Sequence, residues 1–209
     1  MNYSTRDLNK TVKFIIIHYT GMKSLQDAFK KLSHLKSNVS CHYLISKKGI
    51  IFNLLSPNLK AWHAGKSEWK NFKSLNDYSI GIELENKGHD HGYTPFTKEQ
   101  YTSLNKLISS LTFQYCINPR NILGHSDISP NRKKDPGEFF KWDQIKFNDK
   151  LSSIKNHSLD TMLMKYGFSK NYITNYKNLC ILAVKRKLGY KSINDNITKS
   201  FIRDFKHLI

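Results

Sequence analysis

Short apolar runs alternate with amphipathic stretches through most of the chain, and the two patterns predict different elements. Residues 12–17 (VKFIII) and 78–86 (YSIGIELEN) are rich in β-branched side chains, which indicates strands buried on both faces. Residues 42–55 (HYLISKKGIIFNLL) hold two such runs joined at Lys-Lys-Gly, which predicts a β-hairpin. A brief apolar run at residues 121–123 predicts one more strand.

Two stretches between these strands have helical periodicity. Ser24 is a candidate N-cap with Asp27 three residues later, and apolar residues follow at helical spacing. Thr97 and Gln100 form a capping box before a longer helix, whose apolar stripe runs to Tyr115. The order of these elements predicts an α/β fold, a mixed central β-sheet flanked by helices.

The pattern changes after about residue 154. Three amphipathic segments follow at residues 159–166, 179–188 and 197–208, with no strand signal between them. The turn-like sequences YGFSKN and GYKSINDN separate these segments. We therefore expect a small C-terminal three-helix domain, and we divide the chain into residues 1–154 and 155–209.

The 209-residue chain has the composition of a globular protein, with 39% hydrophobic residues and a formal net charge of +18. The charge favours an anionic partner, but the excess is almost entirely Lys, which a coding sequence rich in A and T would also produce. Both explanations remain open. No helix-turn-helix, RNA-recognition or zinc-finger signature occurs, so nucleic acid is not a predicted partner.

Three cysteines lie far apart without a CxxC pairing, so neither a disulfide framework nor a cysteine zinc knuckle is predicted. The apolar run near the N-terminus is too short for a signal peptide or a membrane span. As it stands the sequence predicts a cytoplasmic protein with no transmembrane segment, and we favour a monomer. A leader removed before this numbering begins would instead place the protein in the periplasm or cell envelope.

Position along the chain separates the nine histidines into two groups. Five lie in polar or helical surface contexts, where solvated side chains are expected: His34, His89, His91, His157 and His207. Each of the other four borders an apolar run or a Gly-containing loop: His18, His42, His63 and His125. The ends of buried strands meet at one edge of a sheet, which is where α/β proteins place their sites.

A catalytic zinc site needs three protein ligands and one open position, and His18 and His125 are candidates for two of the ligands. The third ligand must be a carboxylate or another histidine, and Asp127 and Asp135 are the nearby carboxylates. Asp127 is only two residues from His125 and is poorly placed in an extended loop, whereas Asp135 returns after a Pro-bearing excursion. By composition the whole stretch 124–137 (GHSDISPNRKKDPG) is a loop.

Two carboxylates also lie on the predicted strand at residues 78–86. Alternation places Glu83 and Glu85 on the same face as Gly81. A carboxylate beside a buried strand is unfavourable unless it is paired, hydrogen-bonded or used in catalysis. An ion pair with a nearby lysine and a general base both account for these residues, and the residues alone favour neither.

Five motifs occur in order along the chain: FIIIHYT, SCHYLI, AWHAG, NDYSIGIELEN and GHSDISPNRKKDPG. Together they resemble the zinc-dependent N-acetylmuramoyl-L-alanine amidases of the AmpD and AmiD type, whose superfamily also contains phage amidases and peptidoglycan recognition proteins. The resemblance covers about residues 12–145. It implies one Zn²⁺ per chain, held by His18, His125 and Asp135.

The same resemblance implies the reaction and its catalytic residues. The expected reaction is hydrolysis of the amide between the lactyl group of N-acetylmuramic acid and L-alanine of the stem peptide, in peptidoglycan or muropeptides. Glu83 matches the catalytic glutamate and Lys133 the lysine that stabilises the transition state. Cys41 stands where phage relatives have a catalytic tyrosine, which agrees with the AmpD and AmiD branch. A non-catalytic recognition module of the same fold is the alternative.

Further expectations follow less directly from the resemblance. Four residues are expected to line the substrate cleft: His42, Trp62, His63 and Asn76. The C-terminal motifs MLMKYGFS and AVKRKLGY resemble the three-helix peptidoglycan-binding domain of AmiD-type amidases. A helical cap that only stabilises the fold is the alternative for this segment.

Overall fold

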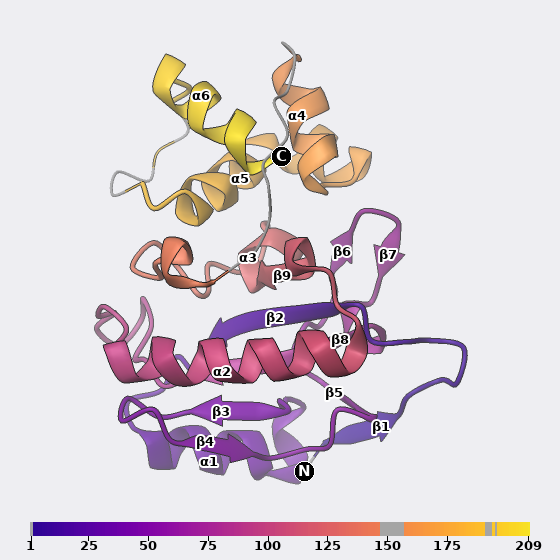
Figure 1. Ribbon diagram of the computed structural model, residues 1–209, viewed down its shortest axis with the longest axis vertical. Coiled ribbons are helices and arrows are strands. Elements are labelled where there is room, and N and C mark those ends of the chain that lie inside the picture. The colour runs from indigo at the N-terminus through magenta and orange to yellow at the C-terminus, as the bar shows by residue number, and fades with distance from the viewer. Residues whose placement is uncertain (1, 147–156, 191–193, 195) are drawn as a thin grey trace.

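A five-stranded mixed sheet forms the centre of the molecule (Figure 1). The computed structural model describes residues 2–146, 157–190, 194 and 196–209. The strand order is β4-β3-β8-β2-β9, in which β4 is antiparallel to β3 and the other pairs are parallel. The strands are β2 Phe14–Tyr19, β3 Tyr43–Ile45, β4 Ile51–Asn53, β8 Ser79–Leu84 and β9 Ile122–Gly124. The mixed sheet and the hairpin predicted from the sequence are both confirmed.

Six α-helices occur in the described residues: α1 Leu25–Ser33, α2 Lys98–Tyr115, α3 His125–Ile128, α4 Leu159–Tyr166, α5 Lys170–Lys187 and α6 Lys199–Leu208. Four short strands have no counterpart in the sequence pattern, because none of them lies in a continuous apolar run: β1 Tyr3–Thr5, β5 Leu59–Ala61, β6 Glu68–Trp69 and β7 Phe72–Lys73. They form two small sheets, β1 with β5 and β6 with β7. None of the described helices is long and apolar enough to cross a bilayer.

Side-chain hydrogen bonds cap the first turns of α1 and α2, at the positions predicted from the sequence. The Ser24 hydroxyl accepts the Asp27 backbone N–H at 3.1 Å at the start of α1. At α2 the Thr97 hydroxyl accepts the Gln100 N–H, and the Gln100 side chain accepts the Thr97 N–H, both at 3.1 Å. Each bond satisfies a backbone donor that has no partner inside the helix, so both predicted caps are confirmed.

The two faces of the sheet are buried by different parts of the chain. Alternate residues of β2, including Ile15 and Ile17, share one apolar cluster with Ile108 of α2. Phe14 and Ile16 point to the opposite face and share a second cluster with the C-terminal helices. On that same face α1 packs over β3 near the β4 edge, where it buries Leu44. The strand β2 is therefore apolar throughout because both of its faces are covered.

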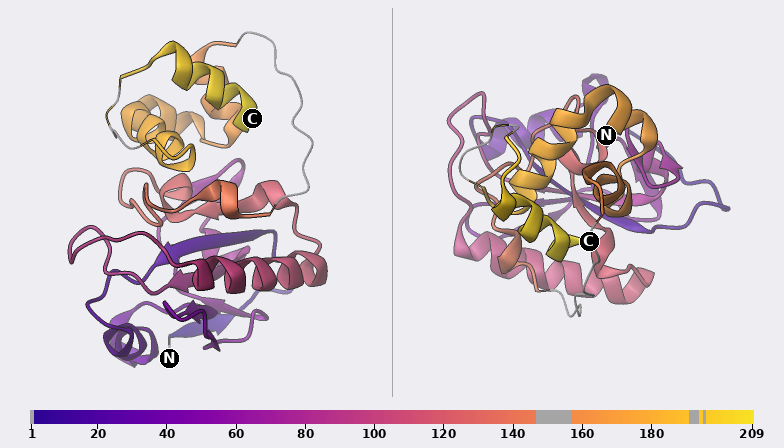
Figure 2. Two further views of the ribbon diagram at one scale, coloured as in Figure 1. Left: turned by 60° about the vertical axis from the view of Figure 1, so that its left-hand side comes forward. Right: turned by 90° about the horizontal axis from the view of Figure 1, so that it is seen from above.

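The C-terminal helices form a layer of their own beyond β9 (Figures 1 and 2). Three helices are present as predicted, but α5 begins at Lys170, well before the predicted segment. Its backbone departs from helical geometry at Tyr176, where φ is −141° and ψ is 33°. This interruption shifts the apolar stripe, which explains why the first half of α5 is not recognised in the sequence. The boundary between residues 154 and 155 lies outside the described residues.

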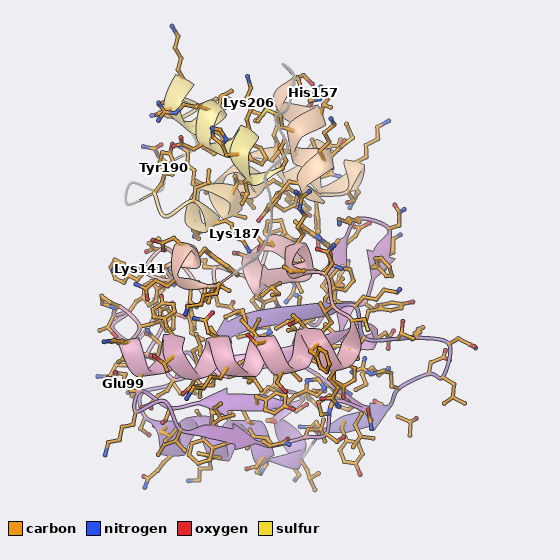
Figure 3. All side chains as sticks on the ribbon, viewed as in Figure 1. Glu99, Lys141, His157, Lys187, Tyr190 and Lys206 are labelled. Carbon is orange, nitrogen blue, oxygen red and sulfur yellow. The ribbon has the colours of Figure 1, made fainter. Side chains whose placement is uncertain are left out.

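Lys187 of α5 lies between the helical layer and the sheet (Figure 3). Its ammonium is 3.5 Å from Asp127 Oδ2, donates to the Ile122 carbonyl at 3.1 Å and lies 3.1 Å from the centre of the Trp142 ring. Burial lowers the pKa of Lys187 from 10.5 to about 8, and Asp127 opposes that shift. Tyr166 of α4 donates its hydroxyl to Asp127 Oδ1 at 3.0 Å. Two C-terminal helices thus contact Asp127 in α3, the short helix directly after β9.

Gly167→Ala tests how closely the helical layer is packed on the sheet domain. Gly167 has a φ of +144°, and a methyl group there would overlap the Trp69 ring. Gly189→Ala is the matched control, because Gly189 also has a positive φ of +74° but an added methyl meets nothing within 4 Å. A Cβ is strained by the positive φ at both positions, so the control accounts for backbone strain as well as for loss of glycine. We expect Gly167→Ala to lower the free energy of unfolding in urea by about 1–3 kcal/mol more than the control. Equal losses would contradict this close packing.

Candidate active site

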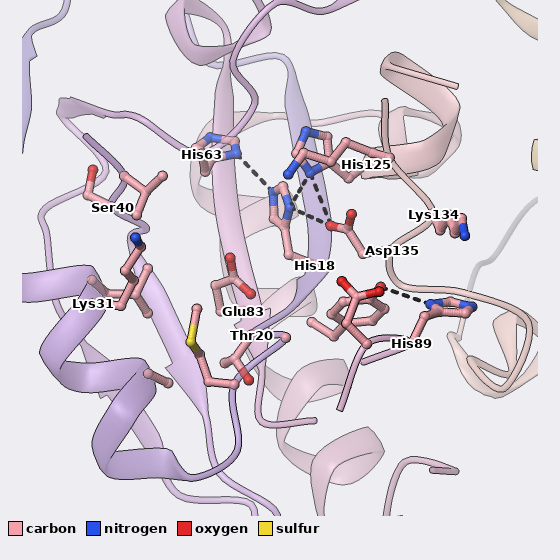
Figure 4. A pocket seen from close by; sticks show the side chains of 18 of the residues that line it. His18, Thr20, Lys31, Ser40, His63, Glu83, His89, His125, Lys134 and Asp135 are labelled. Atoms are coloured by element: carbon pink, nitrogen blue, oxygen red, sulfur yellow. Dashed lines mark hydrogen bonds and ion pairs between the residues drawn. The ribbon is translucent and has the colours of Figure 1, made fainter. Parts of the chain in front are cut away.

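A cavity of about 520 Å³ opens where β2 and β8 end, between α1 and the loop that follows β9 (Figure 4). Its lining includes His18, Glu83, His125, Lys133 and Asp135, which are the five residues predicted to hold the metal or act in catalysis. The structure therefore brings all five to one cavity, although 117 positions separate the first from the last.

Strand register explains how these residues meet. In the parallel pair β2–β8, His18 lies directly beside Glu83, and neighbouring residues in register point to the same face. On the other side of β2, Ile17 pairs with Gly124, so His125 follows directly at the end of β9. The carboxyl ends of three adjacent strands supply the site, as is usual for α/β sheets.

His125 begins the short helix α3, which corrects the prediction that residues 124–137 are entirely loop. Asp127 Oδ2 accepts the Gly124 N–H at 2.8 Å, and this local cap forms a helical turn despite the surrounding Gly and Pro. The Ser126 N–H donates to the Asp135 carbonyl at 2.9 Å. That bond brings the two ends of the predicted ligand loop together.

Three ligand atoms converge in the cavity. His18 Nδ1 is 3.0 Å from His125 Nδ1 and 2.9 Å from Asp135 Oδ2, and His125 Nδ1 is 3.1 Å from the same carboxylate oxygen. All three residues are at least 94% buried, with exposed fractions of 2%, 3% and 6%. Two imidazoles and a carboxylate in this arrangement form a group that could hold a metal ion.

Burial sets the protonation of this group. It lowers the pKa of His18 from 6.5 to about 4, and the neighbouring His125 adds to that effect while the Asp135 hydrogen bond opposes it. Burial acts to raise the pKa of Asp135, but the interactions with His125 and His18 outweigh it and hold that pKa well below its ordinary value. A neutral His18 beside an ionised Asp135 is the state that a metal requires of its ligands.

Glu83 and Lys133 border the same cavity. Oε2 of Glu83 is enclosed and has no hydrogen-bond partner among the described residues. Burial raises the pKa of Glu83 well above 4.5 and Asp135 adds to the rise, while Lys133 lowers it. A carboxyl group with a raised pKa and a free oxygen in a cavity is suited to accept and return a proton.

The two carboxylates that competed with these assignments have other partners. Glu85 accepts the Lys47 backbone N–H at 2.8 Å and does not line the cavity. Asp127 is 1% exposed, and its oxygens bond to Gly124, Tyr166 and Lys187 rather than pointing to His18. Neither joins the group of converging ligand atoms.

The four residues predicted to line the substrate cleft lie in different places. His63 lines the cavity, but the other three do not. His42 is fully buried, accepts the Gly81 N–H at 2.9 Å and donates to the Leu59 carbonyl at 3.0 Å. Trp62 donates its indole N–H to Ser4, and Asn76 Oδ1 accepts two backbone N–H groups.

His89 was expected to be a solvated surface residue, but it lines the cavity. Its Nδ1 is 2.8 Å from the Tyr19 hydroxyl and its Nε2 is 3.1 Å from Glu138, while its ring stacks on Tyr93. The sequence around it (NKGHDHGY) is polar, so periodicity contains no signal for this position. Only the fold brings residues 86–94 beside the end of β2.

A family model described as N-acetylmuramoyl-L-alanine amidase matches residues 8–138. The amidase AmiD of Escherichia coli is 38% identical over 147 residues, which cover 64% of this chain and 52% of AmiD. The 1,6-anhydro-N-acetylmuramyl-L-alanine amidase AmpD of Haemophilus influenzae is 42% identical over 118 residues, or 56% of this chain and 59% of AmpD. The chain thus spans between half and two thirds of these curated relatives.

Among solved structures, a similar one is the complex of E. coli AmiD with the substrate anhydro-N-acetylmuramic acid-L-Ala-D-γ-Glu-L-Lys. Its TM-score is 0.80 at 28% identity, and the match covers 94% of this chain and 88% of that one. A match of this extent includes most of the C-terminal helices as well as the sheet.

Burial of the histidines makes the stability of the metal-free protein depend on pH. Burial lowers the pKa of His42 from 6.5 to about 4, against the hydrogen bond to Leu59. The unfolded chain therefore binds more protons between pH 6.5 and pH 4, so the free energy of unfolding falls as pH falls through that window. We expect His42→Gln to remove about 3 kcal/mol of this acid-induced loss. Urea unfolding of both proteins at several pH values, with a chelator present, measures this difference. The same pH dependence of the free energy of unfolding in both proteins would contradict the prediction.

Proposed function

The chain belongs to the N-acetylmuramoyl-L-alanine amidase family, and on that premise we propose that it hydrolyses the amide between the lactyl group of N-acetylmuramic acid and L-alanine of the stem peptide. The observation that carries the proposal is the buried group of His18, His125 and Asp135 beside Glu83 in one open cavity. A muropeptide of the kind bound in the AmiD complex is the first substrate to test.

We propose zinc as the metal, because the donor set and its spacing fit. Tetrahedral zinc with bonds of about 2.0–2.1 Å separates its ligand atoms by about 3.3 Å. The three ligand atoms here are 2.9–3.1 Å apart. His125 Nε2 is 3.1 Å from the Ala64 carbonyl, which can only accept, so Nε2 donates and Nδ1 is the nitrogen that faces Asp135. Nδ1 is therefore the atom of His125 that would bind the metal.

The reaction then divides between the bound zinc and the side chains of this chain. When bound, zinc supplies Lewis-acid activation of water and of the scissile carbonyl. Glu83 accepts the proton of the attacking water and returns it to the departing alanine nitrogen, for which its raised pKa is suited. Lys133, which lines the same cavity, stabilises the negative charge that develops on the carbonyl oxygen.

Catalysis is favoured over mere recognition because both parts of the chemistry are present. A binding module needs neither a convergent His-His-Asp group nor a carboxylate with an unpartnered oxygen beside it. Residues 155–209 are proposed to add peptidoglycan binding, because their sequence resembles a peptidoglycan-binding domain. Several described residues of this segment also share a core cluster with residues of β2 and β9.

Asp135→Ala tests the metal site. Removing one of three ligands should abolish stoichiometric zinc binding, which elemental analysis of the purified protein measures. Asp127→Asn is the matched control, because Asp127 is equally buried and only eight residues away but bonds to other groups. We expect the control to keep about one zinc per chain. Loss of zinc in Asp127→Asn and retention in Asp135→Ala would reverse the assignment.

Glu83→Gln tests the acid–base role. Gln has the same shape but cannot exchange a proton, so the turnover number on the muropeptide should fall by about 10²–10⁴-fold with zinc content unchanged. Glu85→Gln is the control, since it neutralises a carboxylate two residues further along the chain that accepts the Lys47 N–H and does not line the cavity. We expect it to stay within a few-fold of the wild type. A wild-type rate in Glu83→Gln would show that another group transfers the proton.

A further inference from the structure

We propose that His63, with the adjoining Ala64 carbonyl, positions the two histidines of the metal site, and that His63 is not a substrate-binding residue. The two consecutive residues contact one histidine each. His63 Nδ1 is 3.0 Å from His18 Nε2, and the Ala64 carbonyl is 3.1 Å from His125 Nε2. The proposal rests on the proposed metal site, which it deepens by naming what orients the ligands.

A chain of hydrogen bonds fixes the proton positions on His63. The Ser79 hydroxyl is 2.5 Å from the Leu75 carbonyl, which can only accept, so the hydroxyl donates there. The Ser79 oxygen is then free to accept from His63 Nε2–H at 3.2 Å. A neutral His63 protonated on Nε2 has an unprotonated Nδ1, and that nitrogen faces His18.

The proton position on His63 also fixes the proton position on His18. Since His63 Nδ1 accepts, His18 must donate from Nε2–H, and its own lone pair is on Nδ1. Nδ1 is the atom that lies 2.9 Å from Asp135 and 3.0 Å from His125 (Figure 4). The backbone carbonyl of Leu75 thus determines, through two side chains, which nitrogen of His18 is available to a metal.

The segment that carries His63 is held rigidly. Asn76 Oδ1 accepts the backbone N–H groups of both His63 and Ala64, at 3.0 and 2.7 Å. The His63 ring lies against Gly81 of β8, where any Cβ would overlap it. Asn76 therefore positions the backbone of this segment, and glycine at position 81 is what lets the His63 ring approach the sheet.

Partners of this kind matter because they orient a metal-binding imidazole and raise its basicity. Their removal typically weakens metal binding by about 10–100-fold. A residue that instead contacts only the substrate affects the Michaelis constant and leaves the affinity for metal unchanged. The two roles therefore predict different measurements.

The experiment compares His63→Leu with His63→Asn in competition titrations of zinc against a chromophoric chelator. Leu removes the acceptor, so we expect the zinc dissociation constant to rise about 10–100-fold. Asn can place its carbonyl oxygen where Nδ1 lies, so we expect affinity within a few-fold of the wild type. His42→Leu is the matched control, because it removes a neighbouring buried histidine that has no hydrogen bond to His18. It should lower stability without weakening zinc binding.

Each outcome has a distinct meaning. Wild-type zinc affinity in His63→Leu, or equal losses in the Leu and Asn variants, would overturn the positioning role. A raised Michaelis constant with unchanged zinc affinity would return His63 to the substrate. If His63→Leu does not fold, Ser79→Ala tests the same chain of bonds from outside, and unchanged affinity there would also overturn it. A wild-type protein that binds no zinc would refute the proposed function instead.

Discussion

Parallel pairing of β2 with both β8 and β9 is the interaction on which the site depends. It places His18 beside Glu83 on one side and brings His125 in directly after β9 on the other. The same pairing alternates the side chains, so that Ile15 and Ile17 are buried near α2 while His18 points to the opposite face. A slip of one residue in β2 would exchange the two faces and remove the histidine from the cavity.

Burying several imidazoles together is tolerable because each ring finds a partner that fixes its proton. His42 donates to the Leu59 carbonyl, His125 to the Ala64 carbonyl, and His63 reaches the Leu75 carbonyl through Ser79. All three carbonyls belong to residues 59–75, a segment that holds only short strands between its turns. These backbone carbonyls act as acceptors for the histidines.

The sequence predicted much of the fold because the long elements have strong periodic signals and recognisable caps. The strand at β2, the capping box at Thr97 and the three C-terminal helices are examples, whereas the hairpin was predicted from its turn sequence. It also predicted which five residues would share a cavity, through motifs rather than periodicity. It did not predict His89 in the cavity or the roles of Ser79 and Asn76, because these depend on contacts between segments distant in the chain. Glu85 and Asp127 were ambiguous for the same reason, since their partners are backbone groups and side chains that no local pattern reveals.

The contacts of Asp127 have a consequence for how such chains can evolve. Its carboxylate is bonded by a tyrosine and a lysine from two C-terminal helices, while the same residue caps the turn that begins with His125. A recombination event that replaced these helices with an unrelated module would leave this buried carboxylate without its tyrosine and lysine partners, two residues from that histidine. Domain shuffling at this junction is therefore constrained by electrostatics, because an incoming module has to replace the tyrosine and the lysine.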